Sequence, residues 1–348
     1  MINYCSGNIL LNDAEALVNT VNTVGVMGKG IALQFKKAFP EMEKEYALAC
    51  RRNEVVVGKM HIWDSGAYIP PRYIINFPTK KHWRHPSQLS YIKLGLVDLV
   101  EQIQRLGIQS VAIPPLGCGH GGLSWALVKN EIEKAFQKIP EVEVFLYEPV
   151  GVPRESEILN NTPKPLLTPT TANILRMIYQ YYILEYFNPH LIEIHKLLYF
   201  YEKAGEPLNL HFKKYKYGPY SDSVRHILGR LDGHYISGLG TGESRPLAEV
   251  RILPECMKSV NEFLERTSDP SELSQRNADR VLKLIEGFEN PYGMELLASV
   301  AWATMEDNIV SLEEIIQYLQ NWNERKSKII KPAHVKIAWE RLKHEQWI

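Results

Sequence analysis

The chain has 348 residues, of which 45% are hydrophobic and 23% charged, and its 40 lysines and arginines balance its 40 aspartates and glutamates. A length above that of most single domains predicts two domains, and the even charge argues against non-specific binding to duplex DNA. No apolar run reaches the roughly 20 residues that a membrane-spanning helix needs, and the N-terminus shows no signal-peptide pattern. The four cysteines form no CxxC pair, which favours a reducing cytoplasmic location over a disulfide framework or a structural zinc site.

Strand and helix patterns alternate through the first 150 residues. Short apolar runs predict strands, and apolar residues spaced three and four apart predict helices. Strands are expected at residues 2–7, 16–21, 60–63 (the weakest pattern), 73–78, 110–116 and 142–149, and helices at residues 30–39, 41–52, 88–107 and 123–139. Such alternation predicts an α/β sandwich whose ligand lies beyond the carboxyl ends of the strands.

A change of composition divides the chain after residue 150. Residues 151–170 contain four prolines among asparagine, serine and threonine, which is typical of a linker. Residues 171–348 predict a mainly helical domain. Within it, Ser311 with Glu314 forms a capping-box pattern, and Pro332 is expected at the start of a helix.

Two glycine-rich loops each lie between a predicted strand and a predicted helix. The first, Gly25–Gly30, lacks the spacing of a P-loop, and Gly30 stands where a serine or threonine would bind magnesium. The second, Gly117–Gly122, fits GxGxxG, but only one predicted strand follows it, whereas a Rossmann fingerprint opens its domain. Free N–H groups at both helix starts favour an anion, so the two loops predict a diphosphate clamp. The alternative is that the glycines only make tight turns.

Three segments of this half resemble a known family. They are ALVNTVNTVGVMGKGIALQFKKAFP, NFPTKKHWRHPS and PPLGCGHGGLSW, in this order and spacing. Residues 1–149 resemble a macrodomain, the ADP-ribose-binding fold, in the branch of DNA ADP-ribosyl glycohydrolases found as DarG antitoxins. The resemblance implies a three-layer α/β/α macrodomain with a mixed sheet over residues 1–150, a linker at 151–170 and a mainly α-helical domain at 171–348. No cofactor is expected.

The same resemblance implies which residues bind ADP-ribose. The two glycine loops would clasp the diphosphate and distal ribose, and Asn22 would hydrogen-bond that ribose, although a turn-capping role is the alternative. Near the N-terminus, Asn8 replaces the aspartate with which the family contacts adenine, so charge assistance is absent there. The implied substrate-binding residues are Asn8, Ile9, Asn19, Asn22, Gly25, Val26, Met27, Gly28, Gly30, Thr79, Gly117, Cys118, Gly119, His120, Gly121, Gly122 and Leu123.

Lys80 is the implied catalyst, on the basis of the TKK segment shared with the family. A lysine with a lowered pKa can act as acid, nucleophile or electrostatic clamp. It could attack the anomeric carbon, or its opened aldehyde form, to give a covalent adduct. Alternatively, it could stabilise the leaving base while water attacks. Without the resemblance, the simplest interpretation is that Lys80 and Lys81 are two solvated lysines on a surface loop.

One departure from the family bears on the substrate. Relatives that act on proteins carry an acidic residue at the position of Gly121, and here no carboxylate is available in that loop. Lys80 must therefore do more alone, with His120 as a possible assistant. Gly121 and Gly122 are also expected to open room above the distal ribose for a nucleobase.

The segment after Lys80 mixes cations with an indole ring. Bases stack on aromatic side chains and cations follow phosphates, so Lys81, His82, Trp83 and Arg84 are predicted to contact single-stranded DNA. The alternative is that Trp83 packs in the core. His82 and His85 lack a nearby carboxylate or cysteine, so no metal site is predicted.

The second half carries a less specific resemblance. KLLYF followed by YGPYS, within residues 189–231, resembles the helical domain of several antitoxins, known as Panacea or SocA-like. In DarG proteins this region binds the DarT toxin, so a DarT-type toxin is the partner implied for residues 171–348. The tyrosine- and lysine-rich segment KKYKYGPYSDSVRH could instead contact DNA. Residues 245–348 carry no motif from which a role can be inferred.

The sequence therefore predicts a hydrolase that removes ADP-ribose from DNA bases, with thymidine in single strands as the expected target. Two alternatives stay open: a module that binds ADP-ribose without cutting, and a hydrolase that acts on modified proteins.

Overall fold

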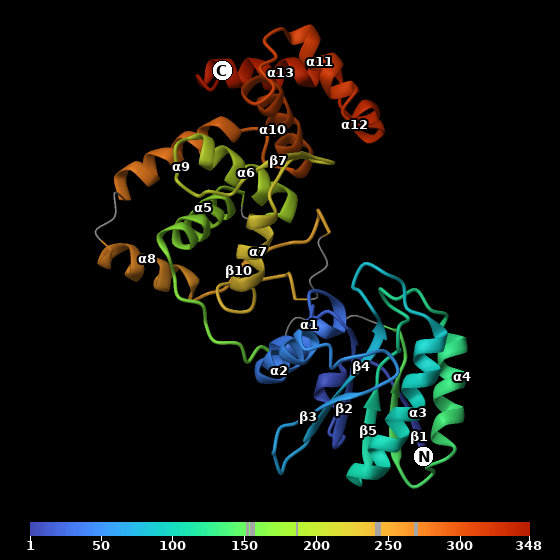
Figure 1. The fold of residues 1–348 in the computed structure, drawn as a ribbon. Coiled ribbons are helices and arrows are strands. Elements are labelled where there is room, and N and C mark those ends of the chain that lie inside the picture. Colours follow the sequence, from blue (N-terminus) through green and yellow to red (C-terminus); the bar gives the residue numbers. More distant parts are fainter. Residues whose placement is uncertain (151–152, 154–156, 186, 241–244, 268–270) are drawn as a thin grey trace. The chain divides into compact units, whose positions relative to one another are not determined.

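A computed structural model describes residues 1–150, 153, 157–185, 187–240, 245–267 and 271–348. The chain forms two compact units (Figure 1). The first comprises mainly Met1–Pro163, and the second comprises most of the chain from Lys164 to Ile348. The expected linker lies partly outside the described residues. Its described part includes Asn161, which bonds to the first unit through Lys37 O and Ala38 O, each at 2.8 Å.

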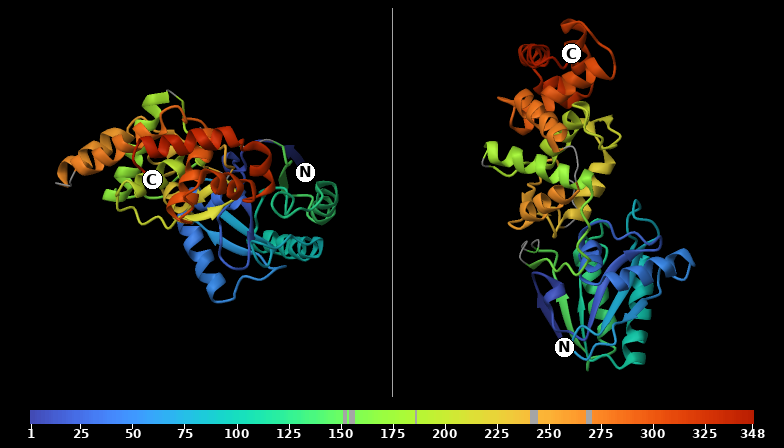
Figure 2. Two further views of the ribbon diagram at one scale, coloured as in Figure 1. Left: turned by 90° about the horizontal axis from the view of Figure 1, so that it is seen from above. Right: turned by 90° about the vertical axis from the view of Figure 1, so that its left-hand side faces the viewer.

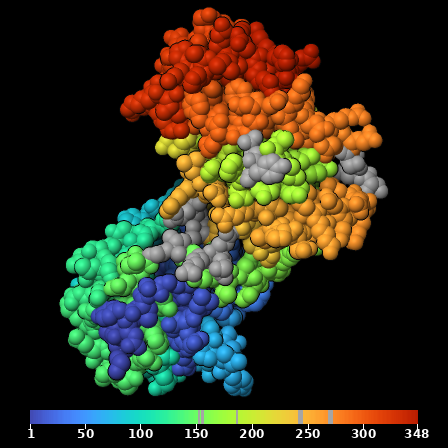
Figure 3. Space-filling model, turned by 180° about the vertical axis from the view of Figure 1, so that it is seen from behind, coloured from blue at the N-terminus to red at the C-terminus, as the bar shows by residue number. Residues whose placement is uncertain are grey.

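A six-stranded mixed sheet forms the centre of the first unit, in the order β1-β6-β5-β2-β4-β3. Five strands run parallel, and β3 pairs antiparallel with β4 at one edge. The strands are β1 (Ile2–Cys5), β2 (Ala16–Asn22), β3 (His61–Asp64), β4 (Tyr73–Lys80), β5 (Ser110–Ile113) and β6 (Glu143–Tyr147). The strand β1 forms the other edge and lies at the surface in Figure 3, where it is dark blue.

Helices cover both faces of the sheet, as the predicted fold class requires (Figure 1). On one face, α3 (Leu89–Leu106) and α4 (Trp125–Phe136) bury residues such as Ile92 and Ile132 against the strands. On the other, α1 (Gly30–Ala38), α2 (Pro40–Arg51) and the short helix η1 (Ile9–Leu11) form a second core around Phe35 and Tyr46. The prediction of a three-layer α/β/α sandwich is confirmed.

The carboxyl ends of the five parallel strands lie at one edge of the sheet, because parallel strands point the same way. The loops after β2, β4 and β5 therefore emerge side by side. The predicted boundaries differ from the observed ones by up to three residues, and two of these differences bear on the site. Pro114 lies beyond the end of β5, and β4 continues through Thr79 to Lys80, so Lys80 lies at a strand end.

The second unit is mainly helical, as predicted (Figure 2). Helix α10 (Pro291–Met305) is buried from Gly293 to Ala303 and packs against α6, α11, α13 and β8. The other elements are α5 (Pro169–Glu185), α6 (Leu191–Lys203), β7 (Lys213–Tyr215), β8 (Gly218–Tyr220), α7 (Asp222–Leu231), β9 (Ile236–Ser237), β10 (Arg251–Ile252), α8 (Cys256–Arg266), α9 (Ser271–Ile285), α11 (Leu312–Gln320), α12 (Glu324–Ile329) and α13 (Pro332–His344). Ser311 caps α11, and Pro332 is the first residue of α13.

The β7–β8 hairpin is fixed from several sides of the second unit. The fully buried Lys196 of α6 donates to Pro219 O at 2.7 Å, and burial lowers its pKa to about 7. Trp322 Nε1 donates to Tyr215 O at 2.9 Å, and Asn323 Nδ2 donates to Lys216 O at 3.0 Å. The lysine of KLLYF and the YGP turn thus form one structural unit. Within the described residues, no helix is long and apolar enough to span a membrane.

One helix–sheet contact leaves no room for a methyl group. A Cβ at Gly95 of α3 would lie 2.3 Å from Cζ of Phe77, whereas a Cβ at Gly229 of α7 would meet nothing within 4 Å. We expect Gly95→Ala to lower the free energy of unfolding of its unit by about 1–3 kcal/mol through overpacking. Gly229→Ala should raise that of the other unit by about 0.5–1 kcal/mol, because alanine favours a helix. Urea denaturation of the full chain measures both, and a Gly95→Ala chain as stable as wild type would contradict the packing.

Candidate functional site

A shift in strand pairing brings the two principal predicted residues together. The strands β2 and β4 pair regularly as far as Val21 and Pro78, and then Asn22 pairs with Lys80, so Thr79 is the extra residue of a bulge. Bulges of this kind re-aim side chains at the end of a strand. Asn22 and Lys80, 58 positions apart in the sequence, therefore lie opposite each other at the carboxyl ends of β2 and β4.

The side chain of Asn22 organises the first loop. Its Nδ2 donates to Val26 O at 2.6 Å, and its Oδ1 accepts from Val24 N at 2.9 Å. The hydroxyl of the buried Tyr46 donates to Asn22 O at 2.6 Å and fixes the backbone from below. Gly25 has a φ of 77° and packs against α2, where a Cβ would lie 3.3 Å from Cys50 Cβ. The turn-capping alternative for Asn22 is thus present in the structure.

The first loop ends in backbone N–H groups that have no partner. The N-cap of α1, Lys29, makes no side-chain capping bond. In the described part of the chain, no hydrogen bond engages the N–H groups of Gly28, Gly30 or Ile31. Unpaired N–H groups at a helix start, together with the helix dipole, form an anion site.

The second loop also presents unpaired backbone N–H groups. Gly122 N bonds to Gly119 O and Leu123 N to Gly117 O, both at 3.1 Å, which curls the loop. The N–H groups of Gly119, His120 and Gly121 have no hydrogen-bond partner among the described residues. Consecutive free N–H groups of this kind form a nest for anions.

The two loops touch each other. A Cβ at Gly30 would lie 3.4 Å from Cδ2 of the His120 side chain, so the start of α1 and the nest are neighbours. An anion between them would face N–H groups from both sides. This contact favours the predicted clamp over two unrelated tight turns.

Lys80 lies at the edge of the second loop. Its Nζ donates to His120 O at 3.0 Å, and burial lowers the pKa of its ammonium group below the ordinary value of 10.5. The carbonyl of Lys81 accepts from Thr23 N at 3.4 Å and Thr23 Oγ1 at 2.8 Å, so the first loop is also joined to the end of β4. Lys80 therefore has a fixed position between both loops.

The segment after Lys80 exposes an aromatic cluster. Trp83 is 47% exposed, which answers the alternative that it packs in the core. The His82 ring stacks on it at 5.2 Å between centroids, and Cζ of Arg84 lies 4.5 Å from its ring. Both groups can present planar or cationic surface to a nucleic acid. Within the described residues, no group of three or more histidine, cysteine or acidic side chains is suited to a metal.

Several predicted contact residues have buried side chains. Asn19 is fully buried, with Nδ2 donating to Asn76 Oδ1 at 2.9 Å, and Thr79 Oγ1 bonds to Val21 O at 3.4 Å. Ile9 and Met27 belong to the core under the first loop. These four side chains support the site from below, so a ligand can reach only their backbone. Burial raises the pKa of the Cys118 thiol to about 11, which makes it a poor nucleophile.

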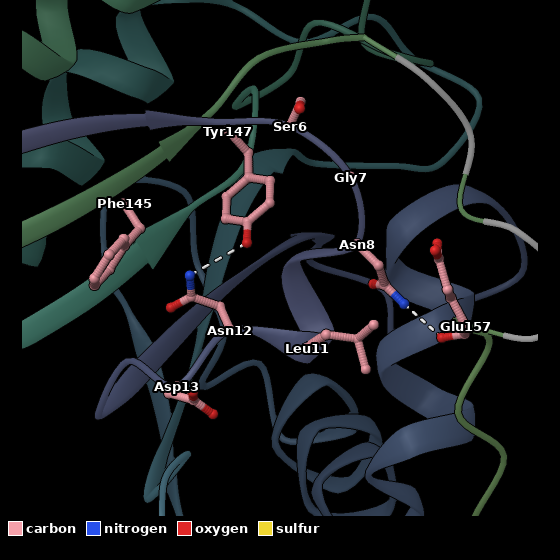
Figure 4. Close-up of a pocket in the computed structure, with 9 residues that line it drawn as sticks. All are labelled: Ser6, Gly7, Asn8, Leu11, Asn12, Asp13, Phe145, Tyr147 and Glu157. Carbon is pink, nitrogen blue, oxygen red and sulfur yellow. Dashed lines mark hydrogen bonds between the residues drawn. The ribbon is translucent and has the colours of Figure 1, made fainter.

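Asn8 lines a separate pocket of about 450 Å³ at the β1–β6 end of the same edge (Figure 4). Its Oδ1 caps η1 by accepting from Leu10 N at 3.0 Å, and its Nδ2 donates to Glu157 O at 2.6 Å. Tyr147 on the pocket wall accepts from Asn12 Nδ2 at 3.2 Å. The Asn8 oxygen keeps one lone pair for a ligand.

The structure corrects the interpretation of Gly121. A Cβ at this position would lie 2.2 Å from Gly117 O and 2.3 Å from Ser87 Oγ, so it would point into the loop and not toward a ligand. Gly121 opens no room above a sugar, and it is required by the curl of the loop. A Cβ at Gly122 meets nothing within 4 Å, although its φ of 76° favours glycine.

Sequence reasoning missed the residues that brace the loops. Thr23, Asn76 and Ser87 lie within the segments that carry the family resemblance, and Tyr46 lies outside them. The motifs imply no role for any of the four, because each acts through backbone or buried contacts. Pairing Asn19 with Asn76 required the β2–β4 register. No local signal in the sequence marks these contacts.

Comparison with known proteins identifies the class that this fold and site define. The Macro domain family model matches residues 18–132. A DNA ADP-ribosyl glycohydrolase from Thermus aquaticus is 44% identical over 343 residues, covering 98% of this chain and 93% of the relative. The macrodomain of Mycobacterium tuberculosis DarG is 57% identical and covers 43% of this chain and 99% of that one, with a TM-score of 0.43.

A further relative, from Thermosipho africanus, is a DNA ADP-ribosyl transferase–DNA ADP-ribosyl glycohydrolase fusion protein. It is 32% identical over 164 residues, which cover 43% of this chain and 42% of the relative. The near full-length match to the Thermus protein decides the family. The chain belongs to the DarG-type DNA ADP-ribosyl glycohydrolases, with an N-terminal macrodomain.

The second loop offers a matched pair of substitutions. A Cβ at Gly121 collides with backbone, whereas a Cβ at Gly119 meets nothing within 4 Å. We expect Gly121→Ala to disrupt the nest and weaken pyrophosphate binding at least about tenfold, while Gly119→Ala stays within about twofold of wild type. Calorimetric titration of the full-length variants measures both affinities. Equal affinities in the two variants would show that the curled conformation is not needed.

Proposed function

We propose that the chain removes ADP-ribose from modified DNA bases, with thymidine in single strands as its substrate and Lys80 as its catalyst. It also binds a DarT-type toxin through residues 171–348. The observation that carries the hydrolase proposal is the junction of two sets of unpaired N–H groups beside a desolvated lysine.

The unpaired N–H groups supply the binding of the substrate. Gly28, Gly30 and Ile31 lie on one side, and Gly119–Gly121 on the other. Together they match a diphosphate, which carries charge along two linked phosphates. Along the strand ends, the Asn8 pocket lies beside β1 and β6, the second loop follows β5, and Asn22 with the first loop follows β2. The proposal places adenine at the Asn8 pocket and the distal ribose near Asn22.

Lys80 has two chemical routes to the same products. In the first, the Nζ lone pair attacks C1″ of the distal ribose, the bond from C1″ to the base nitrogen breaks, and that nitrogen takes up a proton. Water then hydrolyses the adduct and releases ADP-ribose and the amine. In the second, water attacks C1″ while the ammonium group stabilises charge on the leaving base. The lowered pKa of Lys80 favours the first route, because more of the neutral amine is present at neutral pH.

Single-stranded DNA fits the surface beside Lys80. The exposed Trp83 with Arg84 offers a stacking surface and a cation within four residues of the lysine. No acidic side chain can occupy position 121 in this loop conformation, so the carboxylate found in protein-directed relatives is missing. Both observations favour DNA over a modified protein as the substrate.

Lys80→Ala tests the proposal, with Lys81→Ala as the neighbouring control. We expect Lys80→Ala to bind ADP-ribose within about threefold of wild type but to lose at least about 10³-fold in release of ADP-ribose from a modified oligonucleotide. Lys81→Ala should keep kcat. If Lys80→Ala cuts as fast as wild type, the lysine mechanism is wrong, and equal turnover of modified protein by wild type would remove the DNA preference.

The pH dependence of kcat separates the two routes for the same enzyme. An amine nucleophile must be neutral, so kcat should rise with pH and level off above a pKa lower than 10.5. An ammonium clamp must stay charged, so kcat should fall through the same pKa. The first route has a variant in which Lys80 attacks the opened aldehyde form of the ribose. Only in that variant should borohydride reduction during turnover trap a sugar on Lys80.

The β7–β8 hairpin is our choice for the toxin contact. Lys213, Lys214, Tyr215 and Lys216 are exposed, while the backbone beneath them is fixed by α6 and by the segment Trp322–Asn323. A rigid, partly aromatic surface needs little ordering upon binding a protein. The Thermosipho relative, in which both activities share one chain, supports an association between the two enzymes.

Charge reversal on the hairpin tests this contact. We expect Lys214→Glu/Lys216→Glu in a Lys80→Ala background to weaken capture of the cognate toxin at least about tenfold, because the exposed side chains face the partner. Lys258→Glu, at an exposed lysine of α8, should leave capture unchanged. Surface plasmon resonance with full-length chains measures the toxin affinity of both variants. Unchanged toxin affinity in the hairpin variant would show that the hairpin is not the toxin interface.

A further inference from the structure

Ser87 lies beneath the second glycine loop with an unused hydroxyl group. It follows the largely exposed segment 81–86 and precedes α3, and it is 6% exposed. Its N–H donates to Gly121 O at 2.9 Å. Its Oγ is closed to solvent and has no hydrogen-bond partner among the residues that the structure describes. A buried hydroxyl without a partner costs free energy, and an alanine there would avoid that cost.

The loop is shaped around this side chain. A Cβ at Gly117 would lie 2.9 Å from Ser87 Cβ, and a Cβ at Gly121 would lie 2.3 Å from Ser87 Oγ. Glycines at both positions therefore make room for the serine. The Gly121 Cβ position is also 2.2 Å from Gly117 O, so the hydroxyl and this carbonyl are at most about 4.5 Å apart. A small tightening of the curl would join them.

Two hydrogen bonds from outside the second loop hold the residues that carry the free N–H groups of the nest. Lys80 Nζ bonds to His120 O, and Ser87 N bonds to Gly121 O. Both donors come from the polypeptide that runs from the end of β4 to the start of α3. Ser87 therefore connects the loop that binds the anion to the segment that carries the catalytic lysine and Trp83.

We propose that Ser87 is a positioning residue whose hydroxyl gains Gly117 O as its hydrogen-bond acceptor when the Gly119–Gly121 nest closes on a diphosphate. The inference rests on the proposed binding of ADP-ribose at this site. In the free protein the buried, unpaired hydroxyl lowers the stability of the fold. In the complex its new hydrogen bond stabilises the closed loop. Ser87 thereby increases affinity for the ligand without adding to the stability of the unliganded fold.

Ser87→Ala tests this role in the full-length protein, with Ser110→Ala as the matched control. Ser110 Oγ already accepts from Glu15 N at 2.9 Å at the opposite edge of the same sheet. Ser87→Ala should leave the melting temperature of the free protein unchanged or higher and weaken ADP-ribose binding about three- to tenfold, the effect of one neutral hydrogen bond. Ser110→Ala should show the reverse, with lower stability and unchanged affinity.

Turnover of the modified oligonucleotide provides a second measurement. Ser87→Ala should raise KM by the same factor and leave kcat within about twofold, because the hydroxyl touches no reacting atom. A lower melting temperature in the free variant, or wild-type affinity for ADP-ribose, would overturn the role of Ser87 alone. Failure of the wild-type chain to bind ADP-ribose would overturn the proposed function and this inference with it.

Discussion

Unpaired backbone N–H groups at one edge of the sheet are the constraint on which the rest of the first unit depends. A folded chain normally pairs such groups, since burying them without a partner is costly. Here N–H groups at the start of α1 and in the second loop have no partner among the described residues. The sheet brings these two segments together because its parallel strands end at the same edge. The fold thereby builds a site for negative charge from backbone alone, and a net charge of zero is no obstacle.

Open N–H groups require a rigid backbone, and polar side chains supply that rigidity. Asn22 and Tyr46 fix the first loop, and the Asn19–Asn76 pair lies beneath it. The second loop curls so tightly that Gly121 admits no side chain, and it is joined to Lys80 through His120 O. The proposed catalyst and the proposed phosphate-binding loop thus share one frame, because the Lys80 side chain bonds directly to that loop.

The sequence predicted the elements and their order well, because periodic apolar residues report burial directly. It also singled out the two glycine loops and Lys80 as candidates for the site, since glycines and a TKK segment leave local signals. The direction in which each residue faces could not be predicted. Asn19 points into the core, Gly121 is required by loop curvature, and Lys80 opposes Asn22 only through a one-residue shift in strand pairing. These features depend on register and on contacts between distant segments, which periodicity does not encode.

The most direct test of the two-loop clamp is a titration of the isotope-labelled full-length chain with ADP-ribose, followed by backbone amide NMR. The amide signals of Gly28, Gly30, Ile31 and Gly119–Gly121 should shift together, with one common dissociation constant. Shifts confined to a single loop, or absent from both, would contradict the account.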